Sequence, residues 1–118
     1  MNKVGEKIEE LEFKSGRRFS PETLISQLYA GGRSKVWSWG FHNPIASQDK
    51  KGCFALRFTV KGNLFRGHIY VVLNGLDLYD VYYCSNRGNI KMISEHLYCD
   101  NITEVIDEKI EKIPSYQF

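Results

Sequence analysis

The chain has 118 residues, of which 42% are hydrophobic and 25% charged, and sixteen basic against fourteen acidic side chains leave a net charge of +2. These values fit one soluble domain, residues 1–118, with a core of ordinary size. No apolar run approaches the roughly 18 residues that a membrane-spanning helix needs, so we expect no membrane insertion. The pI of 8.4 lies below the value of about 9 that is typical of domains dominated by phosphate contacts, so charge neither requires nor excludes nucleic acid.

Two helices are predicted near the N-terminus. Apolar residues recur at helical spacing over residues 3–14, although residues 1–16 are expected to attach loosely to the domain. Ser20 suits an N-cap and Pro21 the first helical position, which predicts a second helix over residues 20–32.

The middle of the chain has the texture of a sheet, as its aromatic content of 14% also favours. Alternating apolar and polar residues or β-rich composition predict five strands, over residues 35–41, 53–60, 64–73, 78–84 and 89–98. Residues 42–52 are predicted to form a polar loop, and Asn74-Gly75 is a strong hairpin turn signal.

A last helix is predicted over residues 100–114, capped by Asp100 or Asn101 and closed by Pro114, with residues 115–118 as a flexible tail. Short connections between successive strands indicate antiparallel neighbours. The predicted fold is therefore α+β: a five-stranded antiparallel meander with two N-terminal helices and one C-terminal helix packed on one face. A closed or half-closed barrel is the alternative.

The three cysteines, Cys53, Cys84 and Cys99, are odd in number and show no metal-ligand spacing. We expect reduced thiols in a cytoplasmic protein, with no metal and no cofactor.

The sheet face away from the helices holds the candidate site. Strand four can be placed in two registers, and Val81 favours the one that buries Tyr79, Val81 and Tyr83. The exposed face then gathers basic, aromatic and titratable side chains: Arg57, Arg66, His68, Tyr70, Asp80 and Tyr82.

This set suits two kinds of chemistry. Arginine binds phosphate or carboxylate, and tyrosine offers a flat surface on which a base can stack, so Arg57, Arg66, Tyr70 and Tyr82 predict a binding face. A histidine near an acid could act in general acid–base catalysis, which makes His68 and Asp80 the catalytic candidates. The plain alternative is an ordinary polar sheet face, where the same residue types are favoured by cross-strand pairing.

Trp37 and Trp39 are two residues apart, so a strand over residues 35–41 would place both on one face. They would then either cover the core, as we expect for at least one of them, or contribute to a partner surface, since tryptophan is enriched at binding hot spots.

The segments LRFTVKGNLFRGHIYVVLNGLDLYDVYY and YCDNITEVIDEKIEKIP resemble small uncharacterised bacterial proteins of the mobile-element and accessory-gene type. The resemblance implies a bacterial, cytoplasmic setting and no particular activity. The set Arg57, Arg66, His68 and Tyr70 is also similar in kind to the sheet face of RelE-type ribonuclease toxins, although strand order and low net charge differ.

The favoured prediction is a binding or accessory module, in preference to an enzyme, that contacts a protein or a nucleic acid through its basic-aromatic sheet face. The alternative is a small hydrolase or RelE-like ribonuclease. A homodimer formed through an edge strand or the tryptophan surface is a third expectation.

Overall fold

The computed structural model describes residues 18–50, 52–62, 64–74 and 76–110. The predicted helix over residues 3–14, the end of the last predicted helix and the tail 115–118 lie outside these ranges. Along the chain the elements are α1 (Pro21–Ala30), α2 (Arg33–Ser38), β1 (His42–Asp49), β2 (Gly52–Lys61), β3 (Arg66–Leu73), β4 (Tyr79–Cys84), β5 (Ile90–Leu97) and α3 (Ile102–Ile110).

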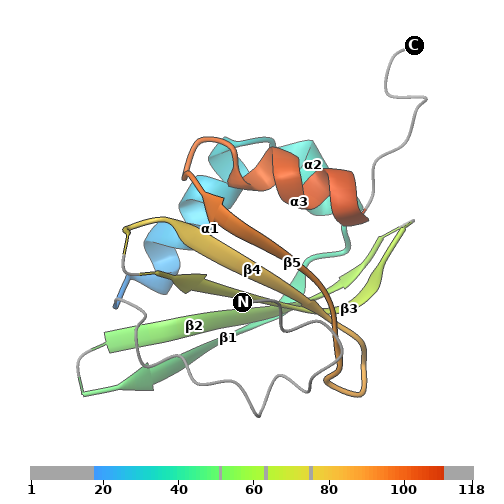
Figure 1. The fold of residues 1–118 in the computed structure, drawn as a ribbon. Helices are drawn as coiled ribbons and strands as arrows, with labels where there is room; N and C mark the ends of the chain where they lie inside the picture. Colours follow the sequence, from blue (N-terminus) through green and yellow to red (C-terminus); the bar gives the residue numbers. More distant parts are fainter. Residues whose placement is uncertain (1–17, 51, 63, 75, 111–118) are drawn as a thin grey trace.

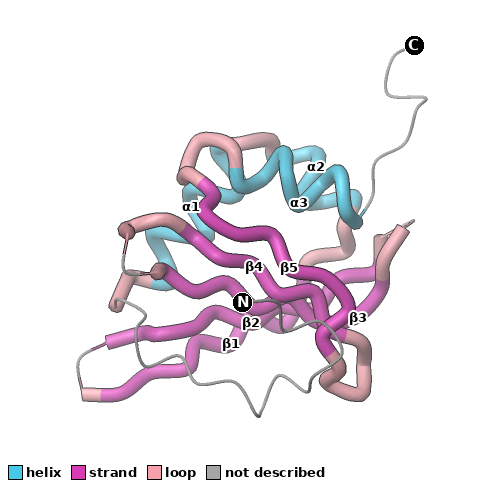
Figure 2. Tube along the Cα trace, viewed as in Figure 1, coloured by secondary structure: helices cyan, strands magenta, loops and turns pink. Residues whose placement is uncertain are grey.

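The five strands form one antiparallel sheet in the order β1-β2-β3-β4-β5, so every strand pairs with its neighbour in sequence. The three helices lie together on one face of this sheet (Figure 1), and Figure 2 shows them as a layer separate from the strands. The predicted α+β meander is confirmed. Because β1 and β5 form opposite edges, the barrel alternative does not apply.

The core fills the space between the two layers. Helices contribute fully buried leucines and isoleucines, such as Leu24 and Leu28 of α1 and Ile102 and Ile106 of α3. Each of these side chains contributes on the order of 1.5–3 kcal/mol through burial. The sheet supplies alternate residues of its central strands, namely Leu56, Phe58, Val60, Ile69, Val71, Tyr79, Val81 and Tyr83. The predicted register of β4 is therefore confirmed.

The predicted strand over residues 35–41 is wrong, because α2 occupies most of it. Gly31 lies so close to Thr103 of α3 that a Cβ would clash with the threonine side chain, and Gly32 has a φ of 148° that favours glycine. These two glycines end α1 and let the chain begin α2 in a new direction.

The helical conformation also separates the two tryptophans, which were predicted to share a face. Residues two apart on a helix point to nearly opposite sides. Trp39 packs into the core with no exposed surface, whereas the side chain of Trp37 is 76% exposed. The expectation that at least one tryptophan belongs to the core is confirmed.

The predicted polar loop over residues 42–52 is also wrong, because β1 lies within it. Pro44 cannot donate a ladder hydrogen bond, but β1 is an edge strand, where proline is tolerated. Asn43 has a positive φ of 53°, and the pairing with β2 shifts between His42 and Ile45. This irregular, polar edge hid the strand in the sequence.

The alternation predicted for residues 53–60 holds from Leu56 onward but not at the start of β2. The pairing with β1 passes from Ala55 directly to Cys53 and skips Phe54. Cys53 is consequently buried and Phe54 only half-buried. Within the described ranges, no helix has the length and apolar character required to cross a bilayer.

Candidate functional site

We call the sheet face opposite the three helices the outer face. One row of side chains crosses it from edge to edge, as the strand pairing shows: Ile45 is opposite Arg57, Arg57 opposite Tyr70, Tyr70 opposite Tyr82, and Tyr82 opposite Ile93. Arg57 on β2 is thus the cross-strand neighbour of Tyr70 on β3, which pairs in turn with Tyr82 on β4. This row contains three of the four sheet residues predicted for binding.

Two further rows lie toward the β2–β3 turn. Thr59 is opposite His68, which in turn is opposite Cys84. Beyond them, Lys61 is opposite Arg66, and both side chains are exposed. Because a strand rises about 3.4 Å per residue, the Arg66 pair lies roughly 13 Å along the strands from Arg57.

The structure therefore places Arg57, Arg66, Tyr70 and Tyr82 on one face, with Arg57 and the two tyrosines adjacent. The pairing also adds Lys61 to the outer face, although the predicted strands over residues 53–60 and 64–73 left it in the turn between them. A count of residues across the β2–β3 hairpin would have placed Lys61 opposite Arg66.

The two tyrosines rest on a small apolar cluster of the outer face. Tyr70, Tyr82 and Ile93 pack against Cys84 and Ile90, both of which are fully buried. Burial, followed by the nearby charges of Asp80 and Glu95, raises the pKa of Tyr82 above its ordinary value. The phenol of Tyr82 therefore stays protonated at neutral pH, and both tyrosine side chains are half-buried.

Arg57 has an unfilled hydrogen-bonding position. Its Nε atom is buried and has no hydrogen-bond partner among the described residues. A buried donor without a partner costs on the order of 1–3 kcal/mol, and more if it is charged. Part of the donor capacity of this guanidinium is thus unused among the described residues.

The surroundings of His68 favour its neutral form. Burial, followed by the charges of Arg57 and His42, lowers its pKa below the ordinary value of 6.5. Its Nδ1 lies 3.1 Å from Oγ1 of Thr59, within hydrogen-bond distance.

The two catalytic candidates, His68 and Asp80, are not brought together. His68 is opposite Cys84 on β4, four residues from Asp80, which itself is opposite Val72. The row of Tyr70 and Tyr82 lies between them.

The carboxylate of Asp80 is instead occupied near the β3–β4 turn. Its Oδ1 accepts hydrogen bonds from Nδ2 of Asn74 and from the backbone N–H of His96, each at 3.0 Å. No carboxylate among the described residues is shown orienting the ring of His68, so the outer face has no visible acid–base pair. The described ranges also contain no cluster of three or more His, Cys, Asp or Glu side chains suited to a metal.

The tryptophans lie elsewhere. Trp39 is buried among the helices, so its ring cannot take the binding role predicted for it. Trp37 is exposed, but on the outside of α2, on the helical side of the sheet.

Neither a family model nor a curated protein nor a solved structure matches this chain. The resemblance to small bacterial accessory proteins stays a prediction, and the functional argument depends on the outer face itself.

Proposed function

We propose that this domain binds single-stranded nucleic acid through its outer face. The observation that carries the proposal is the central row of that face, where Arg57, with an unpartnered Nε, lies beside the cross-strand pair Tyr70 and Tyr82.

The tyrosine pair supplies a stacking surface. Directly opposite residues in an antiparallel sheet have Cβ atoms about 5 Å apart, so the side chains of Tyr70 and Tyr82 are close enough to offer one stacking surface to a ligand. A base stacked on an aromatic side chain contributes about 1–3 kcal/mol without regard to sequence. Duplex bases are already stacked on one another, so such a platform favours a single strand.

The cations supply phosphate contacts on one side of this platform. Arg57, Lys61 and Arg66 follow β2 and β3, and the described acidic residues near the platform, Asp80 and Glu95, lie on β4 and β5. A backbone that follows β2 and β3 would meet positive charge while its bases reach toward Tyr82. The like charges of Lys61 and Arg66, directly opposite each other, are also better accommodated with an anion between them.

Binding is favoured over catalysis because His68 and Asp80 are in different rows and Asp80 has other partners. We further propose a cytoplasmic setting, because Cys53, Cys84 and Cys99 are all free thiols.

The test is a titration of the labelled full chain with a uridine oligomer of about ten nucleotides, followed by amide NMR and by fluorescence anisotropy at several salt concentrations. We expect shifts that cluster on the outer face and weaken with salt, because each phosphate contact contributes a slope of about −0.7 for a single strand. Arg57→Gln and Arg66→Gln should each reduce that slope, and Tyr70→Ala should weaken binding at every salt concentration.

Arg87→Gln is the matched control. Arg87 is an exposed cation in the β4–β5 turn, so its loss changes net charge equally without touching the outer face. If Arg87→Gln and Arg57→Gln weaken binding equally, the interaction is a nonspecific attraction between charges and does not depend on the outer face. Absence of any shift at low salt would rule out nucleic acid and leave a protein as the partner of this face, and cleavage of the oligomer would favour the ribonuclease alternative.

A further inference from the structure

A second surface lies on the helical side of the sheet, away from the outer face. Its centre is Trp37, which at 76% exposure is the most exposed large hydrophobic side chain of the described ranges. Trp37 follows Val36 and precedes Trp39 by two residues, and those two side chains are fully buried. Val36 and Trp39 therefore anchor α2 in the core, whereas Trp37 is directed into solvent.

Two hollows flank Trp37. One, of about 470 Å³, lies between α1 and α2 and is lined by Ile25, Ser26, Tyr29, Ala30, Arg33 and Trp37. The other, of about 790 Å³, shares Arg33 and Trp37 and adds the small residues Ser34 and Ser38. We call the two hollows together the helix groove.

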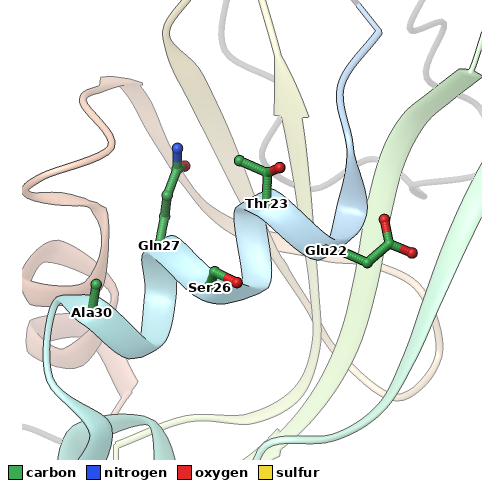
Figure 3. Close-up of a pocket in the computed structure, with 5 residues that line it drawn as sticks. All are labelled: Glu22, Thr23, Ser26, Gln27 and Ala30. Atoms are coloured by element: carbon green, nitrogen blue, oxygen red, sulfur yellow. The ribbon is translucent and has the colours of Figure 1, made fainter.

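A third hollow continues the helix groove along α1, because it shares Ser26 and Ala30 with the first. Figure 3 shows its lining residues along one side of α1, namely Glu22, Thr23, Ser26, Gln27 and Ala30. Its acidic residue, Glu22, lies at the start of α1, about two helical turns from the end of α1 that leads into α2.

One cation is positioned in the helix groove. The guanidinium of Arg33 lies over the ring of Tyr29, with its central carbon 5.6 Å from the ring centre. Such cation–π contact restrains the side chain and leaves its N–H groups for a planar anion. Among the described residues, no acidic side chain lines either hollow beside Trp37.

We propose that the helix groove docks an acidic–apolar peptide, a protein segment in which a carboxylate neighbours a large apolar side chain. The carboxylate would pair with Arg33 in bidentate fashion, and the apolar side chain would pack on Trp37. Charge complementarity also orients the segment, because Glu22, in the third hollow that continues the helix groove along α1, repels further acidic residues.

Nucleic acid fits this groove poorly. The described part of its lining contains Ile25, Ala30 and two aromatic side chains with one arginine, whereas a nucleic-acid strand gains most of its affinity from several phosphate contacts. The proposal is independent of the function assigned to the outer face, since the two surfaces lie on opposite sides of the sheet and share no residue.

The test is a selection of phage-displayed random peptides of about a dozen residues on the immobilised full chain, with parallel selections on Trp37→Ala and Leu76→Ala proteins. Leu76 is the matched control, because it is a comparably exposed apolar side chain in the β3–β4 turn. We expect peptides with Asp or Glu beside Phe, Leu or Trp to be enriched on the wild-type and Leu76→Ala proteins but not on Trp37→Ala.

The strongest selected peptide, made synthetically, should bind at least about tenfold more weakly to Trp37→Ala and to Arg33→Gln, as expected for loss of a hot-spot residue. An amide in place of the peptide carboxylate should weaken binding to the wild type but add little to the effect of Arg33→Gln. Arg57→Gln should leave peptide affinity unchanged. Absence of acidic–apolar enrichment, or selected peptides that bind Trp37→Ala as well as wild type, would overturn the proposal.

Discussion

The two faces of the sheet differ in how their polar groups are satisfied. On the helical side, buried polar atoms have partners even in the core: Nε1 of Trp39 donates to Oδ1 of Asp107 at 3.0 Å, and the hydroxyls of Tyr83 and Ser94 are 3.0 Å apart. On the outer face, Nε of Arg57 is buried without a partner among the described residues. Hydrogen bonds among buried polar groups thus stabilise the helical side, whereas on the outer face the buried N–H of Arg57 makes no such bond within the described residues.

The same contrast is visible in charge. The buried side of the sheet presents apolar and hydrogen-bonded groups to the helices, and the carboxylate of Asp107 is the acceptor for Trp39. The outer face places two cations, Lys61 and Arg66, directly opposite each other. Like charges in that position oppose folding, so this pair does not contribute to stability.

The largest expected effect separates the two tryptophans. Trp39→Ala should lower the free energy of unfolding by about 3–5 kcal/mol, because it leaves a cavity and removes the hydrogen bond to Asp107. Trp37→Ala should change it by less than about 0.5 kcal/mol, since the side chain is exposed. Urea unfolding of both variants measures the difference, and similar losses for the two would show that Trp37 is also part of the fold.

The next largest effect is expected at alkaline pH, which should lower the free energy of unfolding. Burial raises the pKa of Tyr83 from its ordinary value of 10.0 to about 12. Between these values the unfolded chain releases the phenolic proton and the folded chain retains it, so stability falls as pH rises, by about 1.4 kcal/mol per unit. Unfolding measured at pH 8 and pH 11 should show this decline.

Variants at two positions identify the groups responsible. Tyr83→Phe should flatten the decline above pH 10, although it loses the contact with Ser94 at every pH. Burial also raises the pKa of Cys84 from 9.0 to about 12, so Cys84→Ala should delay the onset of the decline. An unchanged alkaline profile in both variants would contradict this account.

A smaller effect is expected on the outer face, and in the opposite direction. Arg57→Met keeps much of the apolar length of the side chain and removes the unpartnered Nε, so stability should stay the same or rise by up to about 1 kcal/mol. Urea unfolding checks this, with Arg87→Met as the exposed control. A loss of more than about 1 kcal/mol would mean that Arg57 belongs to the structure rather than to a binding face.

The contrast between an apolar face and a polar face also explains which strands could be predicted from the sequence. Strands β2 to β5 were predicted within one or two residues because one face is apolar and the other polar, and the hairpin signal Asn74-Gly75 separates two of them. Once that alternation was read, Arg57, Tyr70 and Tyr82 necessarily shared a face.

The N-terminal half could not be predicted so well. The six residues of α2, RSKVWS, show only one helical repeat, from Val36 to the C-cap Trp39, and the overlapping segment KVWSWGF has the composition of a strand. What fixes it is a partner 68 residues away, Asp107. The contact between Arg33 and Tyr29 was equally hidden, because it depends on how the Gly31-Gly32 turn places α2 beside α1.

The smallest expected effect tests whether the outer face acts as one electrostatic unit. Burial, Arg57 and His42 lower the pKa of His68, so the unfolded chain binds a proton more readily and stability falls as pH decreases below 6.5. Arg57→Met should raise this pKa toward 6.5, and a bound oligonucleotide should raise it as well, because phosphate favours the protonated ring. Histidine ring signals followed by NMR from pH 4 to 8 report both changes. If neither Arg57→Met nor a bound oligonucleotide changes the pKa of His68, then Arg57 and His68 do not interact electrostatically. The ligand would then have to be placed on the tyrosines and Arg66 alone.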